Sequence, residues 1–399
     1  MNLAFFFGGA SVEHEISVIS ACQAMNAADS AKYNVIPVYM AKNGRMYTGE
    51  ALKQVQAYKD TEALYKNATE VCFLKASPST KMFSLKRRGD KVKLCKELST
   101  IDLALPVVHG TNCEDGTIMG FLEIMGIPYA SCDVISSAAG MDKEFTKCIL
   151  SRHGIPVVDY FAFRSSEYFE NKDAILNKIE KDFGYPVIVK PANLGSSIGI
   201  SKASTREKLV DALDLAATFT PKLLVEHAVT NLREINCSVL GSADECECSV
   251  LEEPVMQDEV LSYRDKYMGG AKGAKGAKVG GAKSGVKCEG SKGGMSSLQR
   301  KVPADIPEEI AEKIREYAKR TFTVLGCNGV SRIDFLLDGE DVYVNEINTI
   351  PGSLSFYLWE AAGVSFDKLI DRIVECGINA AREKSKLNFD CGVNVLGGK

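Results

Sequence analysis

This 399-residue chain has no apolar run long enough to cross a membrane and no cysteine pair at C-x-x-C spacing. A membrane helix needs about 18 or more consecutive apolar residues. The N-terminal MNLAFFFGGA also lacks the positive region that opens a signal peptide. Its 13 cysteines are irregularly spaced, which indicates reduced thiols rather than a disulfide framework. These absences predict a cytoplasmic protein.

The chain also lacks an excess of positive charge. It carries 52 Asp and Glu against 48 Lys and Arg, a net charge of −4, which argues against general binding to nucleic acid or anionic membranes. The local exception is residues 268–294, with ten glycines, six lysines and one acidic residue. This segment has no interleaved aromatic residues and cannot form a core, so we expect an insertion that is ordered at most on demand.

Two common nucleotide fingerprints are missing as well. Neither G-x-x-x-x-G-K-[ST] nor G-x-G-x-x-G matches the glycine loop KPANLGSSIG at residues 190–199. Backbone N–H groups and serines of such a loop can still bind phosphate oxygens, with the leading lysine as a cation. A plain turn is the alternative interpretation of this loop.

Apolar strands do alternate with helical stretches in the first third of the chain. LAFFF (3–7), YNVIPVYM (33–40) and DLALPVVHG (102–110) are typical of buried strands, the last ending in a polar loop, and KMFSLKRRGDKVKLCK (81–96) is typical of a surface β-hairpin. This order predicts an α/β domain on a largely parallel sheet.

A polar face is predicted on two strands near the C-terminus. Arg332 and Asp334 are two residues apart, as are Glu346 and Asn348, so each pair points one way from its strand. A short turn pairs the strands, which brings Asp334, Glu346 and Asn348 to one face beside Arg332. Such oxygen ligands suit a hard cation such as Mg²⁺, and a solvated outer face is the alternative.

Two further clusters follow predicted strands. GGASVEHEIS (8–17) turns into a helix with Glu13 near its start, where an acid can also complement the helix dipole. HGTNCEDG (109–116) begins with His109, for which a purely structural role is the alternative. Gly8 and Gly9 of the first loop permit close backbone approach, and the second loop lies at the carboxyl end of a strand, where open α/β sheets bind ligands.

Six stretches together resemble the D-alanine–D-alanine ligase family of the ATP-grasp superfamily. They are GGASVEHEIS, HGTNCEDG, SSAAGMDK, VKPANLGSSIG, RIDF and NEINTIPG, in the family's order. The resemblance implies an α/β fold with a three-domain ATP-grasp architecture. Its units would be an N-terminal Rossmann-like parallel-sheet domain on the substrate side at 1–131, a central subdomain at 132–225, a C-terminal subdomain with the lid loop at 226–385, and a tail at 386–399.

The resemblance implies that ATP binds between the second and third domains. Lys143 and Lys190 match the family's phosphate-binding lysines, and Ser197 belongs to the phosphate loop. Glu226 matches the hinge residue at the adenine, and Glu234 matches the ribose carboxylate.

Five residues match the family's catalytic positions. Glu13 matches the acid that holds the ammonium of the first D-alanine, and Ser196 the serine that links this acid to the lid tyrosine, here Tyr267. Arg332 and the backbone at Gly352 match the groups that stabilise the oxyanion.

The implied chemistry is carboxylate activation by ATP. One D-alanine becomes an acyl phosphate, the amine of a second attacks it, and the dipeptide supplies peptidoglycan synthesis. Asp334, Glu346 and Asn348 match the ligands of two Mg²⁺ ions, for which Mn²⁺ is an alternative. The sequence leaves the oligomeric state open, a homodimer included.

Two features depart from the family. The Gly/Lys-rich insertion directly follows Tyr267, either as a solvated segment or as a lid extension whose lysines approach ATP. The segment after Gly352 is shorter than in the family, where it ends in a Ser-Leu pair that binds the carboxylate of the second substrate. Ser353 and Leu354 of this shorter segment are assigned that role. His109 is expected near the first substrate.

Several rival functions stay open at this point. Retention of the lid tyrosine favours a dipeptide over a D-alanine–D-lactate ester, but D-serine remains an alternative second substrate. Another ATP-grasp carboxylate–amine ligase is a second alternative. A non-catalytic ATP-binding regulator predicts damaged metal ligands or loss of the arginine, and neither is seen.

Overall fold

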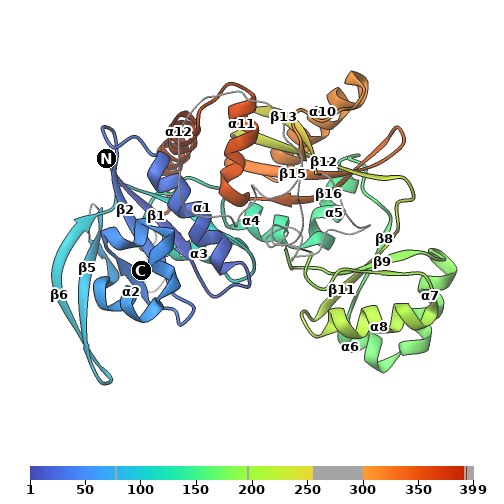
Figure 1. The fold of residues 1–399 in the computed structure, drawn as a ribbon, viewed down its shortest axis with the longest axis horizontal. Coiled ribbons are helices and arrows are strands. Elements are labelled where there is room, and N and C mark those ends of the chain that lie inside the picture. Colours follow the sequence, from blue (N-terminus) through green and yellow to red (C-terminus); the bar gives the residue numbers. More distant parts are fainter. Residues whose placement is uncertain (77–78, 196, 255–299, 391, 393–399) are drawn as a thin grey trace, which may run out of the picture.

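The computed structural model describes residues 1–76, 79–195, 197–254, 300–390 and 392 (Figure 1). Ser196, Tyr267 and the insertion at 268–294 lie outside these residues. The described chain forms three β-sheets, and helices pack on each of them. No helix in the described ranges combines the length and the apolar character that crossing a membrane requires.

The first sheet has seven strands in the order β6-β5-β4-β3-β2-β1-β7. β1 pairs in parallel with β2 and β7, and its residues Leu3 to Phe7 are fully buried, as is typical of a parallel strand covered on both faces. Strands β3 to β6 pair antiparallel, including the predicted hairpin, in which Arg88 faces Lys91. The predicted parallel sheet is therefore present in three strands, and four antiparallel strands extend it.

In the first unit, a short loop after β1 leads into α1, which lies at the edge of the unit that faces the rest of the molecule (Figure 1). Its strands are β1 (Asn2–Gly8), β2 (Asn34–Met40), β3 (Met46–Thr48), β4 (Thr69–Ala76), β5 (Ser79–Arg88), β6 (Lys91–Thr100) and β7 (Leu103–Val108). Its helices are α1 (His14–Ala27), η1 (Glu50–Lys53), η2 (Val55–Lys59), α2 (Thr61–Asn67) and α3 (Thr117–Met125).

The second sheet is a small antiparallel one in the order β10-β9-β11-β8, with three helices on one side (Figure 1). Its strands are β8 (Tyr160–Arg164), β9 (Val187–Pro191), β10 (Ser201–Ala203) and β11 (Lys222–His227). The helices are α6 (Ser165–Glu170), α7 (Lys172–Asp182) and α8 (Arg206–Ala217). Its core holds apolar residues from Phe163 to Val225.

The third sheet is antiparallel throughout, in the order β14-β13-β12-β15-β16. Its strands are β12 (Leu232–Gly241), β13 (Cys246–Pro254), β14 (Arg300–Lys301), β15 (Gly329–Asp338) and β16 (Asp341–Asn348). The helices nearby are α4 (Val134–Met141), α5 (Lys143–Arg152), α10 (Glu308–Val324), η4 (Gly352–Ser355), α11 (Phe356–Ala361) and α12 (Phe366–Ser385).

The hydrophobic cores show how these units are joined. Leu150 of α5 and Ile155 belong to the core of the third sheet, although they precede the second sheet in sequence. Trp359 and the apolar face of α12 belong to the core of the first sheet, and the Trp359 indole donates a 2.9 Å hydrogen bond to Ser238 of β12. This packing anchors η4 between the first and third sheets, beside the site described next.

Candidate active site

One cavity collects polar side chains from several parts of the chain. Its lining comes from the loops after β1 and β7, the start of α5, the glycine loop after β9, and strands of the third sheet. The predicted site residues that line it are Glu13, His109, Lys143, Glu234, Arg332, Asp334, Glu346, Asn348 and Gly352. The fold thus brings together residues that are up to 339 positions apart in the sequence.

Glu13 lies where two glycine loops approach the start of α1. Its side chain is buried, and a Cβ added to Gly110 or Gly195 would lie 2.7 or 2.8 Å from its Oε2 atom. Only glycine leaves room for this carboxylate at both positions. The loop of residues 190–199 is therefore packed against the predicted first-substrate acid.

His109 and Glu114 tie the loop after β7 to the segment before η4. The His109 ring nitrogens lie 3.0 Å from the Ile350 carbonyl and 3.0 Å from the Ser20 hydroxyl, and burial lowers the pKa of His109 to about 4. The Glu114 carboxylate accepts from the backbone N–H groups of Ile350 and Gly110, and burial raises its pKa to about 8. At neutral pH the imidazole is therefore uncharged.

A buried ion-pair cluster lies behind the glycine loop. Glu226, which is 1 % exposed, lies 2.9 Å from Lys147 and 2.6 Å from Lys190. Burial alone would raise the pKa of Glu226, but the two lysine charges lower it. Burial also lowers the pKa of Lys147, against the attraction of the glutamate. The Lys190 ammonium donates in addition to Asn345 of β16 at 2.9 Å.

Lys143 connects this glycine loop with the third sheet. Its ammonium donates to the Leu194 carbonyl at 2.7 Å and lies 3.2 Å from Glu346. The Lys143 backbone N–H also donates to the Ala192 carbonyl at 2.8 Å. These contacts hold the Lys143 ammonium between the carbonyls of the glycine loop and the Glu346 carboxylate, where its positive charge can attract a phosphate ligand.

The predicted polar face is present on β15 and β16. Asp334 is opposite Glu346, and Arg332 is opposite Asn348, which confirms the predicted pairing of the two strands. Arg332 donates to both Asp334 oxygens at 2.7 Å, and Asn348 donates to one of them at 3.1 Å. Although burial opposes the charged form, Asp334 raises the pKa of Arg332.

These residues suit a hard cation. Within the described ranges, no three His, Cys, Asp or Glu side chains cluster as metal ligands. The candidate donor set here has only two carboxylates, those of Asp334 and Glu346, and the Asn348 amide as a third donor. Cations already contact both carboxylates, Arg332 on one and Lys143 on the other. Because these oxygen donors already attract positively charged groups, their chemistry is suitable for Mg²⁺.

The segment after β16 makes a strained turn. Ser353, Leu354 and Ser355 have φ values of 52°, 53° and 52°, which non-glycine residues adopt rarely and mostly at functional sites. The Ser353 N–H donates to Ser20 at 2.9 Å and its hydroxyl donates to Gln23 at 2.7 Å. Ser353 and Leu354 are thus buried against α1, while Gly352 lines the cavity.

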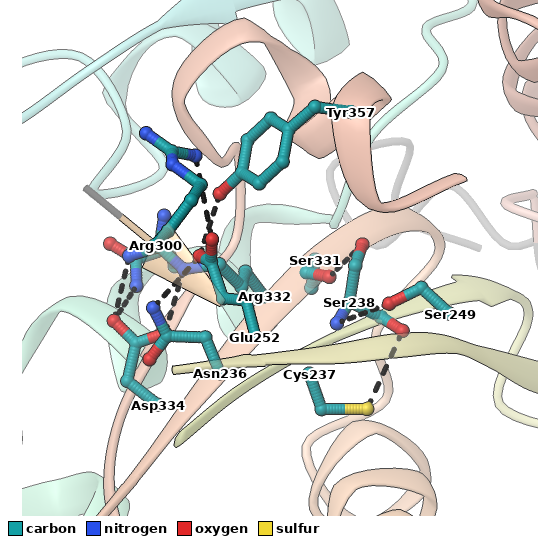
Figure 2. Close-up of polar contacts among 11 residues, drawn as sticks. Asn236, Cys237, Ser238, Ser249, Glu252, Arg300, Ser331, Arg332, Asp334 and Tyr357 are labelled. Carbon is teal, nitrogen blue, oxygen red and sulfur yellow. Dashed lines mark hydrogen bonds and ion pairs between the residues drawn. The ribbon is translucent and has the colours of Figure 1, made fainter. Parts of the chain in front are cut away.

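Sequence patterns did not single out a polar network on the other side of Arg332 (Figure 2). Glu252 of β13 accepts from the Tyr357 hydroxyl at 2.7 Å and from Asn236 at 3.0 Å. Arg300 of β14 lies 3.4 Å from the second Glu252 oxygen, and its guanidinium is 4.3 Å from the centre of the Tyr357 ring. Figure 2 shows both side chains converging on the Glu252 carboxylate.

Family models match nearly the whole chain. The model described as the D-ala D-ala ligase N-terminus matches residues 2–132, and the model described as the D-ala D-ala ligase C-terminus matches residues 149–280 and 289–375. The chain belongs to the D-alanine–D-alanine ligase family.

Individual relatives agree with this membership. The D-alanine–D-alanine ligase of Thermosipho melanesiensis is 39% identical over 98% of both chains. The solved D-alanine–D-alanine ligase of Coxiella burnetii is 26% identical, with a TM-score of 0.75 over 97% of this chain and 96% of the other. The VanG D-Ala:D-Ser ligase of Enterococcus faecalis is 27% identical, with a TM-score of 0.73 over 94% of this chain and 99% of the other.

Residues that sequence analysis missed in this member of the D-alanine–D-alanine ligase family are Lys147, Glu114, Glu252, Arg300 and Tyr357. A signal existed for Lys147, which lies one helical turn after Lys143 and so on the same helix face. Glu114 stands within the HGTNCEDG loop, where an acid at the carboxyl end of a buried strand could have been singled out. The other three come from separate segments without a motif.

Proposed function

We propose that this protein is an ATP-dependent D-alanine–D-alanine ligase that forms the dipeptide for peptidoglycan synthesis and releases ADP and phosphate. The observation that carries this proposal is the single cavity lined by Glu13, Lys143, Arg332 and the polar face of β15 and β16. A carboxylate for an ammonium, cations for phosphates and an arginine for an oxyanion are the groups that the reaction requires.

In the first step, a D-alanine carboxylate oxygen attacks the γ-phosphorus of ATP. The bond from that phosphorus to the bridging oxygen breaks, and ADP leaves an acyl phosphate behind. We assign neutralisation of the transferred charge to Lys143 and Lys190, with Ser197 in the phosphate loop. Glu226 and Glu234 are assigned to the adenine and the ribose, and Glu13 to the ammonium of this first D-alanine beside His109.

In the second step, the amine of another D-alanine attacks the acyl carbon and loses a proton. Arg332 and the backbone at Gly352 are proposed to stabilise the oxyanion of the tetrahedral intermediate, which then expels phosphate. Ser196 and Tyr267 remain predictions for closing the site.

Mg²⁺ is proposed to be held by Asp334, Glu346 and Asn348. When bound, the ion would supply positive charge that offsets the negative charge on the phosphoryl oxygens during transfer. Support comes from the donor chemistry and from the cations that contact these carboxylates.

A cytoplasmic location and a homodimer also stay predictions. The described cysteines are free thiols, which is typical of a reducing compartment.

The decisive test is phosphate release from ATP with D-alanine alone, and then with D-serine or D-lactate added. We expect release with D-alanine alone and D-alanyl-D-alanine as the product. If D-alanine supports no release in any pairing, the ligase proposal is wrong. Preferred release with D-lactate would contradict only the dipeptide product.

A further inference from the structure

Arg300 is a second arginine of the cavity. It lines the same cavity as Arg332 and Gly352, and the Tyr357 ring supports its guanidinium at 4.3 Å. A guanidinium stacked on an aromatic ring keeps its planar fork oriented, as recognition of a carboxylate needs.

The other cavity cations are committed to close acidic partners. Arg332 makes two 2.7 Å hydrogen bonds to Asp334, and Lys143 lies 3.2 Å from Glu346. Arg300 lies farther from its acidic neighbour, at 3.4 Å from Glu252. Among the ion pairs Arg332–Asp334, Lys143–Glu346 and Arg300–Glu252, the last is therefore the longest.

Glu252 has two hydrogen-bond donors besides Arg300. The Tyr357 hydroxyl and the Asn236 amide both donate to its other oxygen, and burial raises the pKa of Tyr357, which keeps that hydroxyl a donor. If Arg300 moved toward a ligand, the Glu252 Oε1 atom would keep both hydrogen bonds, while the Oε2 atom would lose its contact with the guanidinium. Tyr357 and Asn236 would thus still hold the glutamate in place.

The segment after Gly352 leaves room for such a role. The donors of Ser353 are directed at Ser20 and Gln23 of α1, and neither Ser353 nor Leu354 is among the cavity-lining residues in the described part of the chain. A second amino acid in this cavity needs another partner for its carboxylate.

We propose that Arg300 binds the carboxylate of the second D-alanine, with Tyr357 and Glu252 as positioning residues. This inference rests on the proposed ligase function. Binding by Arg300 would make the site of the second D-alanine selective for amino acids with a free carboxylate. This selectivity would come from an ion pair with Arg300 and not from the shortened segment after Gly352.

The test compares Arg300→Gln with Arg300→Lys and the control Lys301→Gln. Lys301 is the neighbouring residue on β14, pairs with Glu253 at 3.1 Å and has a side chain that is 54% exposed. Because successive residues of a strand point to opposite sides, the control removes the same charge away from the cavity. Initial rates are resolved into Michaelis constants for ATP, the first D-alanine and the second D-alanine, and D-alaninamide serves as an acceptor without a carboxylate.

For Arg300→Gln we expect a rise of about tenfold to a hundredfold in the Michaelis constant for the second D-alanine, as loss of a charge-assisted hydrogen bond implies. The constants for ATP and the first D-alanine should stay unchanged. The preference for D-alanine over D-alaninamide should fall by the same factor, with partial retention in Arg300→Lys and none of these changes in Lys301→Gln.

An unchanged second Michaelis constant, or an equal loss with both acceptors, would overturn the assignment. If Arg300→Gln fails to fold, Arg300→Lys is judged by the same two criteria. Failure of the ligase function itself is distinguishable, because the unaltered enzyme would then release no phosphate with D-alanine.

Discussion

The buried cluster proposed for the ATP side and the cavity residues proposed for the amino-acid side hold their charges differently. On the proposed ATP side, Lys147, Glu226 and Lys190 form short ion pairs in an almost fully buried cluster. On the amino-acid side, His109 is uncharged at neutral pH, and Glu252 is held largely by neutral donors. The difference indicates that buried ion pairs hold the charges on the proposed ATP side. On the proposed amino-acid side, uncharged partners hold most of the polar groups.

The substitution Glu226→Gln removes the charge that pairs with both lysines of the proposed ATP side. Two buried lysines would lose their counter-charge, so we expect a loss of about 3–5 kcal/mol in the free energy of unfolding, measured by urea denaturation. The matched control is Glu253→Gln, whose carboxylate also lies between two cations, Arg233 and Lys301. Those cations are substantially exposed, so the control should lose only about 0–1 kcal/mol. Equal losses in the free energy of unfolding of both variants would contradict the difference between the buried and the exposed ion pairs.

Arg332→Ala tests the group placed between the two sides. Loss of an oxyanion donor should lower kcat by about 10²–10³, measured as phosphate release at saturating substrates. Arg332→Lys should recover part of the rate because it keeps a positive charge. A kcat within tenfold of the unaltered enzyme would contradict the role.

His109 gives the amino-acid side a pH signature. Burial lowers its pKa from 6.5 to about 4, so the unfolded state takes up a proton below pH 6.5 while the folded state does not. The free energy of unfolding should therefore fall between pH 6.5 and pH 4, by about 3 kcal/mol in total, and this contribution is absent above pH 6.5. Stability of the unaltered chain and of His109→Gln should be compared across that window. A parallel pH dependence of the two proteins would show that the imidazole is not the cause.

Tyr357→Phe makes the smallest change, since the ring under Arg300 stays and only the donor to Glu252 is lost. A neutral hydrogen bond contributes about 1 kcal/mol, so we expect roughly a fivefold rise in the Michaelis constant for the second D-alanine. An equal rise in the constant for ATP would mean a general distortion instead.

Part of this site could be predicted from local sequence and part could not. The two-residue spacing of Arg332 and Asp334 fixed which side of β15 they share, and the pairing with Glu346 follows from a short turn. Glu252 and Tyr357 are 105 positions apart, and no spacing rule connects residues that meet only through tertiary packing. The same limit applies to the first sheet, whose parallel strands show as continuous apolar runs while its antiparallel extension depends on how the later strands pair.

The central claim is that the first D-alanine is activated as an acyl phosphate in this cavity. The most direct measurement uses D-alanine labelled with ¹⁸O in its carboxylate and analyses the released products by mass spectrometry. Attack of that carboxylate on ATP predicts one labelled oxygen in the inorganic phosphate and none in the nucleotide, which leaves as ADP. Unlabelled phosphate, or label in AMP, would contradict the account.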